Sequence, residues 1–116
     1  MEHSFSFVLL LDIYGDLLSN GQREALDMKY NADLSLSEIA EEIGGVTRQS
    51  VHYSIKNGER RLLELEKTLG FAQRLRTLSA QLDRAGEILS GMSADYSGDK
   101  RFDEINDILS EVKRGL

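Results

Sequence analysis

The amino-acid sequence predicts an all-α fold, and three observations support that prediction. Its 116 residues contain no proline, the residue that most often interrupts a helix. Apolar residues recur every three or four positions along most of the chain, which is the spacing of one helix face. No segment alternates between apolar and polar residues with the period of two that a half-buried strand shows. We therefore expect helices throughout and no sheet.

The first part of the chain is expected to fold as three short helices and the start of a longer one. Residues Phe5 to Leu18 carry a 3.6-residue apolar period and predict the first helix. Ser19 with Gln22, and Ser35 with Glu38, have the spacing of capping boxes, so they predict where the second and third helices begin. The second helix is expected to end near residue 31.

The stretch from Leu34 to Lys56 has the order expected of a helix-turn-helix. Gly44, followed by a second glycine, provides the positive φ that a sharp turn between two helices needs. Ala40 is small where the second helix is expected to cross closely. The positions predicted to face inward are Leu36, Ile39, Ala40, Ile43, Val46, Val51 and Ile55. The spacing from Ala40 to Val51 is eleven residues instead of the usual ten, which indicates one extra residue in the turn.

Positive charge is concentrated at the start of the predicted fourth helix. The whole chain has a net charge of −6, and residues 1–47 carry −7. Residues 48–61 carry four basic side chains against one acid, a net charge of +3, and residues 62–116 carry −2. A short basic segment inside an acidic protein predicts local, salt-dependent binding to phosphate groups.

Seven residues in this segment are candidates for contact with nucleic acid: Thr47, Arg48, Gln49, His52, Tyr53, Lys56 and Arg60. Thr47 is the predicted N-cap of the fourth helix, and the helix N-terminus attracts a phosphate oxygen. Arg48 has the geometry to pair with guanine, and Gln49 with adenine. Gln49, His52, Lys56 and Arg60 follow one another at steps of three, four and four, so they share one helix face.

The rest of the chain is predicted to be helical and to self-associate. Gly70 is expected to end the fourth helix, and an apolar stripe then resumes. Its large members are Leu75, Leu78, Leu82 and Leu89. A polar loop is expected over 91–100, with Asp99 capping a last helix. We expect a helix-turn-helix domain over 1–69 and a helical extension over 70–116, whose leucines are covered by a second chain or fold back on this one.

Two segments resemble the YlxM family, small bacterial proteins with a helix-turn-helix similar to region 4 of sigma factors. They are FVLLLDIYGDLLSNGQREALDMKY and LSLSEIAEEIGGVTRQSVHYSIKNGERRLLELEKTLG, and the similarity extends from Phe7 to about Leu75. The run from Ser35 to Val51 and the three residues starting at Gln22 are its most specific parts. Genes of this family commonly neighbour those of the signal recognition particle. The resemblance therefore implies a sigma-region-4-like bundle and a role in that targeting pathway.

Catalysis, cofactors and metals are not expected. The two histidines, His3 and His52, have no carboxylate pair at ligand spacing, and Ser50 points away from His52. There is no cysteine for a thiolate metal site, and no lysine–serine pair follows the glycines as in a phosphate loop. The apolar run near the N-terminus is too short to span a bilayer. These observations predict a cytoplasmic binding protein that is not an enzyme.

Three functions are consistent with the sequence. The first is a DNA-binding regulator that uses the helix starting at Thr47. The second is an accessory factor that binds RNA or a ribonucleoprotein, with signal recognition particle RNA as the target that the resemblance implies. The third is a protein adaptor that binds through its apolar C-terminal helices. The basic start of the fourth helix favours the first two, whereas the acidic total and the altered turn favour the last two.

Overall fold

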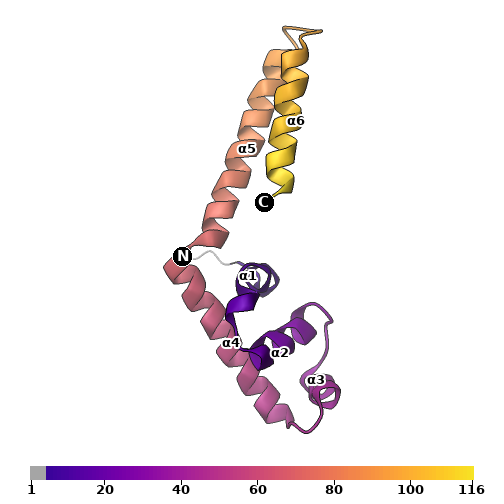
Figure 1. The fold of residues 1–116 in the computed structure, drawn as a ribbon, viewed down its shortest axis with the longest axis vertical. Helices are drawn as coiled ribbons and strands as arrows, with labels where there is room; N and C mark the ends of the chain where they lie inside the picture. Colours follow the sequence, from indigo (N-terminus) through magenta and orange to yellow (C-terminus); the bar gives the residue numbers. More distant parts are fainter. Residues whose placement is uncertain (1–4) are drawn as a thin grey trace. The chain divides into compact units, whose positions relative to one another are not determined.

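The computed structural model describes residues 5–116, and within that range it contains helices and no strand. This confirms the predicted all-α class. The elements are α1 (Phe7–Tyr14), the 3₁₀ turn η1 (Gly15–Leu17), α2 (Asn20–Tyr30), α3 (Leu36–Ile43), α4 (Arg48–Leu69), α5 (Phe71–Ser93) and α6 (Lys100–Arg114). The chain forms two compact units, one that extends to Ala72 and one over Gln73–Leu116. Figure 1 shows α1 to α4 gathered together in the first unit.

The helix starts follow from side-chain caps. The Ser19 hydroxyl accepts from the Gln22 backbone N–H at 3.2 Å, and the Gln22 side chain accepts from the Ser19 N–H at 3.4 Å. Ser35 and Glu38 form the same reciprocal pair at the start of α3, with distances of 3.1 and 2.9 Å. Both predicted capping boxes are present. Each satisfies two backbone N–H groups that have no partner inside the helix.

Two predicted boundaries differ from the structure. The first helix was expected over 5–18, but α1 begins at Phe7 because Ser6 is its N-cap, accepting from the Leu9 N–H at 3.2 Å. It ends at Tyr14, and Gly15–Leu17 continues as a separate 3₁₀ turn. The polar loop expected over 91–100 is shorter, because α5 continues to Ser93.

The core of the first unit lies along one face of α4, which contacts α1, α2 and α3. The largest fully buried side chains are Tyr14, Leu10, Leu26, Ile39, Ile55 and Leu62. Val51 is also buried, so three of the positions expected to face inward, Ile39, Val51 and Ile55, lie in the core. Leu36, Ala40 and Ile43 are half-buried and pack against this core, as inward positions should. One expectation was wrong: Val46 is 40% exposed because it lies in the turn before α4.

The crossing of α2 and α4 involves a residue that the sequence pattern did not single out. Gly58 is buried in α4, and a Cβ added there would lie 2.7 Å from Cδ1 of Leu26 in α2. Real Cβ atoms do not approach so closely, so α2 and α4 cross where α4 has no side chain. The crossing of α2 and α4 therefore needs a residue without a side chain at position 58.

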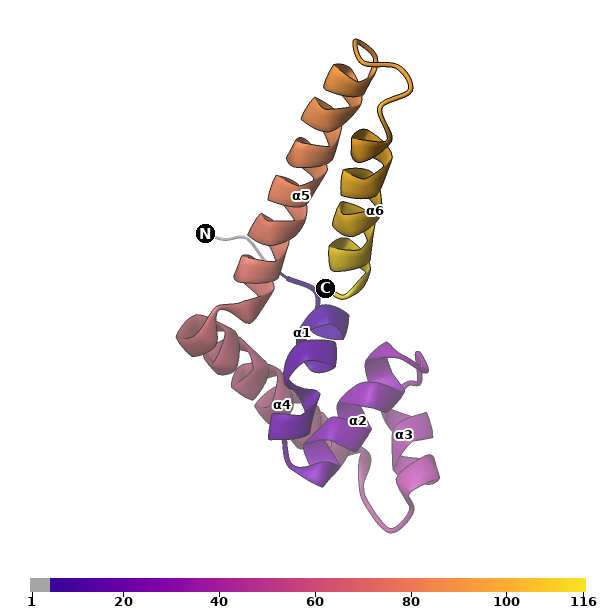
Figure 2. The ribbon, with the colours of Figure 1, turned by 45° about the horizontal axis from the view of Figure 1, so that its top comes forward.

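The second unit is a helical hairpin. Figures 1 and 2 both show α5 and α6 side by side and antiparallel. The Lys113 ammonium pairs with the Asp83 carboxylate across the two helices. Within residues 73–116, Leu89 is the one buried hydrophobic side chain. In the described part of the chain, no helix is long and apolar enough to cross a bilayer.

Candidate nucleic-acid interface

The turn between α3 and α4 contains two consecutive glycines in the left-handed region. Gly44 has a φ of 78° and Gly45 a φ of 70°. The Gly44 N–H donates to the Ala40 carbonyl at 3.0 Å and so completes the last turn of α3. Side chains with a Cβ rarely adopt this φ, which explains why the extra residue in the turn is a glycine. The turn delivers the chain to Thr47 and the start of α4.

Thr47 caps α4, as its position predicted. Its hydroxyl accepts from the Ser50 backbone N–H at 3.0 Å, and the Ser50 hydroxyl donates to the Thr47 carbonyl at 2.9 Å. The Thr47 hydroxyl proton remains available for an acceptor in solution. The first turn of α4 contains no acidic residue, so the positive end of the helix dipole is not neutralised there.

All seven residues predicted for the site are exposed: Thr47, Arg48, Gln49, His52, Tyr53, Lys56 and Arg60. Val51, Ile55 and Gly58 hold the opposite side of α4 against the core. At 100° per residue, the six helical members of the site fall within about 140° of the helix circumference. The structure therefore places them on one side of α4, with the helix N-terminus at one end of the surface. We call these seven residues the α4 face.

The cations of the α4 face differ in how free they are. Among residues 5–116, the Arg48 guanidinium has no hydrogen-bond or ion-pair partner. The Arg60 Nη1 donates to Oδ1 of Asn57 at 3.2 Å. The Lys56 Nζ lies 3.6 Å from Oε1 of Glu59, although the side chain is 55% exposed. Arg48, at the first position of the helix, can thus bind an anionic ligand without first breaking a contact with another side chain of residues 5–116.

A buried carboxylate lies beneath the α4 face. Glu59 is 7% exposed and accepts a hydrogen bond from the Tyr30 hydroxyl. The Lys29 Nζ also donates to Glu59, at 3.4 Å. Burial by itself would raise the pKa of Glu59, but the Tyr30 hydrogen bond and the Lys29 charge outweigh it and lower the pKa below its usual value. The carboxylate therefore stays ionised and attracts Lys56, three residues earlier on α4.

Sequence reasoning missed this network, although a signal for it was present. Ile55 and Leu62 belong to the apolar stripe of α4, and Glu59 occupies the position between them where another apolar residue was due. An acid within an inward stripe predicts a buried partner of opposite charge or a strong hydrogen-bond donor. Lys29 and Tyr30, at the end of α2, are those partners.

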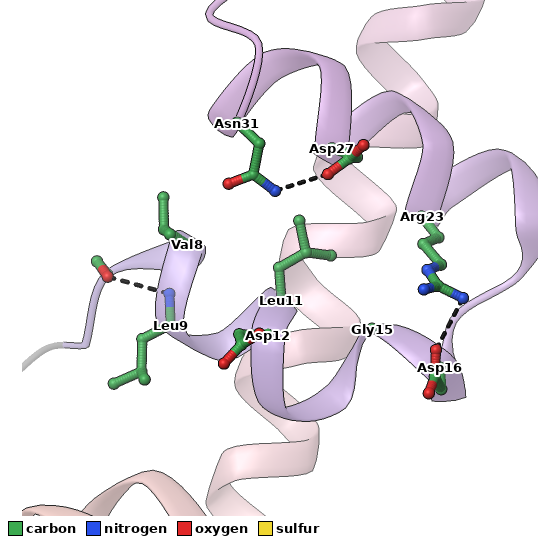
Figure 3. A pocket seen from close by; sticks show the side chains of 10 residues that line it. Val8, Leu9, Leu11, Asp12, Gly15, Asp16, Arg23, Asp27 and Asn31 are labelled. Atoms are coloured by element: carbon green, nitrogen blue, oxygen red, sulfur yellow. Dashed lines mark hydrogen bonds and ion pairs between the residues drawn. The ribbon is translucent and has the colours of Figure 1, made fainter. Parts of the chain in front are cut away.

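A hollow of about 480 Å³ lies elsewhere in the first unit, between α1, η1 and α2 (Figure 3). Asp12, Asp16 and Asp27 line it, and no residue of the α4 face does. Its one arginine, Arg23, pairs with Asp16 at 2.7 Å, as the dashed line in Figure 3 shows. Three carboxylates against one paired cation repel phosphate, so this hollow is not a candidate for the nucleic-acid site.

Across residues 5–116, no group of three or more histidine, cysteine, aspartate or glutamate side chains is arranged to hold a metal ion. His3 lies outside the described residues. The α4 face consists of exposed side chains that can form hydrogen bonds and ion pairs.

Comparison with known proteins supports the helix-turn-helix assignment. Residues 1–108 match the family described as "UPF0122: Putative helix-turn-helix protein, YlxM / p13 like". A UPF0122 protein of Acetivibrio thermocellus is 39% identical over 94 residues, which cover 81% of this chain and 77% of the relative. Another, from a Thermoanaerobacter species, is 36% identical over 117 residues, which cover 100% of this chain and 96% of the relative. One from Symbiobacterium thermophilum is 41% identical over 93 residues, covering 80% and 84% respectively.

Proposed function

The chain belongs to the UPF0122 family of YlxM/p13-like helix-turn-helix proteins, and from this premise we propose that it is a regulatory protein that binds duplex DNA. The α4 face is the reading surface in this proposal. The observation that carries it is the exposed Arg48 at the first position of α4, which has no partner among residues 5–116 and lies next to the exposed Gln49. In helix-turn-helix proteins, residues at the start of the second helix contact base edges in the major groove.

Base reading is assigned to the first turn of α4. Arg48 donates two parallel hydrogen bonds to the N7 and O6 atoms of guanine, and Gln49 pairs with the N6 and N7 atoms of adenine. Both side chains are exposed, so neither has to break a contact with the core before it reaches a base. These two residues give the sequence preference in this proposal.

Phosphate contacts are assigned to the rest of the α4 face. Thr47 and the free N–H groups of the helix N-terminus hold one phosphate oxygen, as helix N-termini commonly do. His52, Lys56 and Arg60 follow along one side of the helix and meet the backbone. Lys56 is shared with the buried Glu59, so its contribution to affinity is smaller than that of an unpaired lysine.

The acidic surroundings of the α4 face limit its affinity. Glu41 and Glu42 of α3 are exposed, and the first helix of such a motif crosses the DNA backbone. Their charges oppose the phosphates. A single copy of the domain is therefore a weak binder with a strong salt dependence, and a second copy on the same DNA supplies the remaining affinity.

Fluorescence anisotropy with labelled duplex DNA and with structured RNA, including signal recognition particle RNA, tests the proposal at low and moderate salt. On a preferred duplex selected from a random pool, Arg48→Ala weakens binding by about 1–3 kcal/mol because a base contact is lost. Lys56→Ala lowers affinity more evenly across sequences. It also flattens the slope of log affinity against log salt by about one unit, because one phosphate contact is lost.

Lys67→Ala is the matched control, since it removes one exposed positive charge from the far end of the same helix. It is expected to change affinity little. Equal binding by the wild type and the Arg48 and Lys56 variants would exclude the α4 face. Binding of RNA in preference to duplex DNA would instead support the accessory-factor function, and binding of neither would support the adaptor function.

A further inference from the structure

We propose that two copies of this chain pair through the hairpin of α5 and α6 to form a four-helix bundle. In this bundle, α5 of one copy lies against α6 of the other. The proposal is independent of the proposed DNA binding, because it rests only on residues of the second unit. Three observations support it: the small core of the hairpin, the width of its apolar stripe, and the charges along its two edges.

The hairpin buries little apolar surface of its own. Between the two helices, Leu89 is 9% exposed, while Leu82, Phe102 and Leu109 are half-buried. Two helices with so small a seam do not bury enough apolar surface to offset the entropy of ordering 44 residues, Gln73–Leu116. The hairpin therefore needs another apolar surface against it.

One face of the hairpin provides that surface. The exposed fractions of its large apolar residues are 49% for Ile88, 48% for Met92, 43% for Ile105, 56% for Ile108 and 48% for Val112. At 100° per residue, those on α5 lie beside the inward Leu89, and those on α6 lie beside the inward Leu109. The apolar stripe on each helix thus spans more than 90°, which is wider than one neighbouring helix covers and is typical of a bundle.

The two stripes meet in a groove that runs along the same face. It is lined by Ala85, Ile88, Leu89, Met92, Ile105 and Leu109, with a volume of about 330 Å³. Every lining residue is apolar, and both helices contribute. The apolar surface is therefore continuous across α5 and α6, as the interface of a two-fold bundle must be.

Charge identifies the occupant as a second copy. Residues 73–116 carry seven basic and eight acidic side chains, a net charge of −1, so two such units meet with almost no net repulsion. The first unit, up to Ala72, carries seven basic and twelve acidic side chains, a net charge of −5. A self-complementary apolar face on a nearly neutral unit is what a symmetric interface requires.

Charges at the edges of the face select the arrangement. Helical periodicity places Arg84 at the outer edge of the α5 stripe and Glu111 at the outer edge of the α6 stripe. A two-fold axis parallel to the helices brings the outer edge of α5 against the outer edge of α6 of the other copy, so opposite charges meet. An axis perpendicular to the helices would bring each edge against its own copy, with like charges facing. Both arrangements make all neighbouring helices antiparallel, so the edge charges decide between them.

Sedimentation equilibrium on the full chain is the first test. The wild type at tens of micromolar is expected to give twice the 13.0 kDa mass of one chain. The double variant Ile88→Glu, Ile105→Glu places carboxylates in the interface and weakens association by about 100-fold or more. Ser90→Glu is the matched control, because Ser90 is exposed and lies about 200° around α5 from Ile88. It is expected to leave the dimer intact.

A charge exchange tests the arrangement without placing any charge in the apolar face. The Arg84 and Glu111 side chains are 71% and 73% exposed, so changes there do not threaten the fold. Arg84→Glu and Glu111→Arg are each expected to weaken the dimer by about tenfold, and the two together to restore most of the loss. Restoration requires the two positions to meet between copies, since they lie on opposite edges of one hairpin.

Three results would overturn the proposal. A wild type that remains a monomer at about 100 μM would show that the hairpin face does not bind a second copy. An interface of this kind is expected to associate well below that concentration. A dimer that the Ile88→Glu, Ile105→Glu variant leaves unchanged, with helicity retained in circular dichroism, would place the interface elsewhere. A dimer in which the charge exchange restores nothing would contradict the pairing of α5 with α6.

Discussion

Glu59 shows how one side chain connects the core with the proposed binding surface. Its carboxylate accepts from Tyr30 and Lys29 of α2, and Lys56 of the α4 face lies 3.6 Å from its other oxygen. The buried oxygens are therefore fully used, as a carboxylate in the interior requires. This arrangement holds the end of α2 against the middle of α4.

Glu59→Gln is expected to lower the free energy of unfolding by about 1–3 kcal/mol at pH 7, because charged hydrogen bonds become neutral ones. The folded-state pKa of Glu59 lies below its unfolded value of 4.5. The stabilisation by the carboxylate is therefore complete above that value and is lost as the pH falls through the folded-state pKa. Urea unfolding followed by circular dichroism is expected to show the gap between variant and wild type closing below about pH 4.

Glu64→Gln serves as the control for this measurement, since Glu64 is a 58% exposed acid on the same helix. Its effect is expected to stay within about 0.5 kcal/mol at all pH values. A Glu59→Gln deficit that does not change between pH 7 and pH 3 would show that the carboxylate's charge does not stabilise the fold.

Single residues of the α4 face were predictable because exposure follows from helical spacing. Val51 and Ile55 fix which side of the helix is inward, and that places His52 and Lys56 outward. The contacts of Glu59 with Lys29 and Tyr30 were not predictable in the same way. They depend on where the end of α2 lies against α4, which is a property of the tertiary fold that no local spacing encodes.

Between elements, the crossing of α2 and α4 depends on Gly58. A glycine in the middle of a 22-residue helix costs about 0.5–1 kcal/mol relative to alanine. The fold accepts that cost because Leu26 occupies the space where a Cβ would be, with its Cδ1 2.7 Å from the ideal Cβ position. Leu26 itself is fully buried, so it has little room to move.

Gly58→Ala is therefore expected to destabilise the protein by about 1–3 kcal/mol, since overpacking outweighs the gain in helix propensity. Gly21→Ala is the matched control. Gly21 is an exposed glycine of α2, and an added Cβ would meet nothing within 4 Å. That substitution is expected to stabilise by about 0.4–1 kcal/mol. Thermal unfolding of both variants measures the difference, and stabilisation by Gly58→Ala would contradict the close crossing.

The ends of the elements were more predictable than their packing. Capping boxes at Ser19 and Ser35 and the cap at Thr47 depend on residues within one turn, so the sequence pattern locates them directly. For the opposite reason, the sequence pattern did not single out Gly58, the small residue at the α2–α4 crossing. Which small residue lies at a crossing depends on the angle between two helices, and that angle is set by all the residues that pack between them.

For the whole molecule, the two proposals together have a consequence for DNA recognition. A two-fold dimer carries two α4 faces related by the same axis, so its preferred site is an inverted repeat. Neither unit has this property alone: the α4 face is in the first unit, and the proposed interface is in the second. In these proposals, the unit that contacts DNA is thus separate from the unit that forms the dimer.

Binding to inverted repeats of varied spacing is expected to show affinity maxima about 10–10.5 base pairs apart, because the two α4 faces must reach the same side of the duplex. The Ile88→Glu, Ile105→Glu variant is expected to lose these maxima and to bind all spacings with the affinity of a single half-site. Electrophoretic mobility shifts on a spacing series provide the measurement. A wild type that is indifferent to spacing would show that the two copies do not read one DNA together.

The first turn of α5 depends on residues synthesised much earlier. The Phe71 N–H donates to the Tyr14 hydroxyl at 3.1 Å, and the Ala72 N–H donates to the Glu66 carboxylate at 2.9 Å. Tyr14 in turn donates to the same Glu66 oxygen at 2.6 Å and is almost fully buried. Since a chain leaves the ribosome from its N-terminus, α1 has emerged before residues 71 and 72 appear. The order of synthesis therefore supplies the hydroxyl that α5 needs at its start before α5 itself is made.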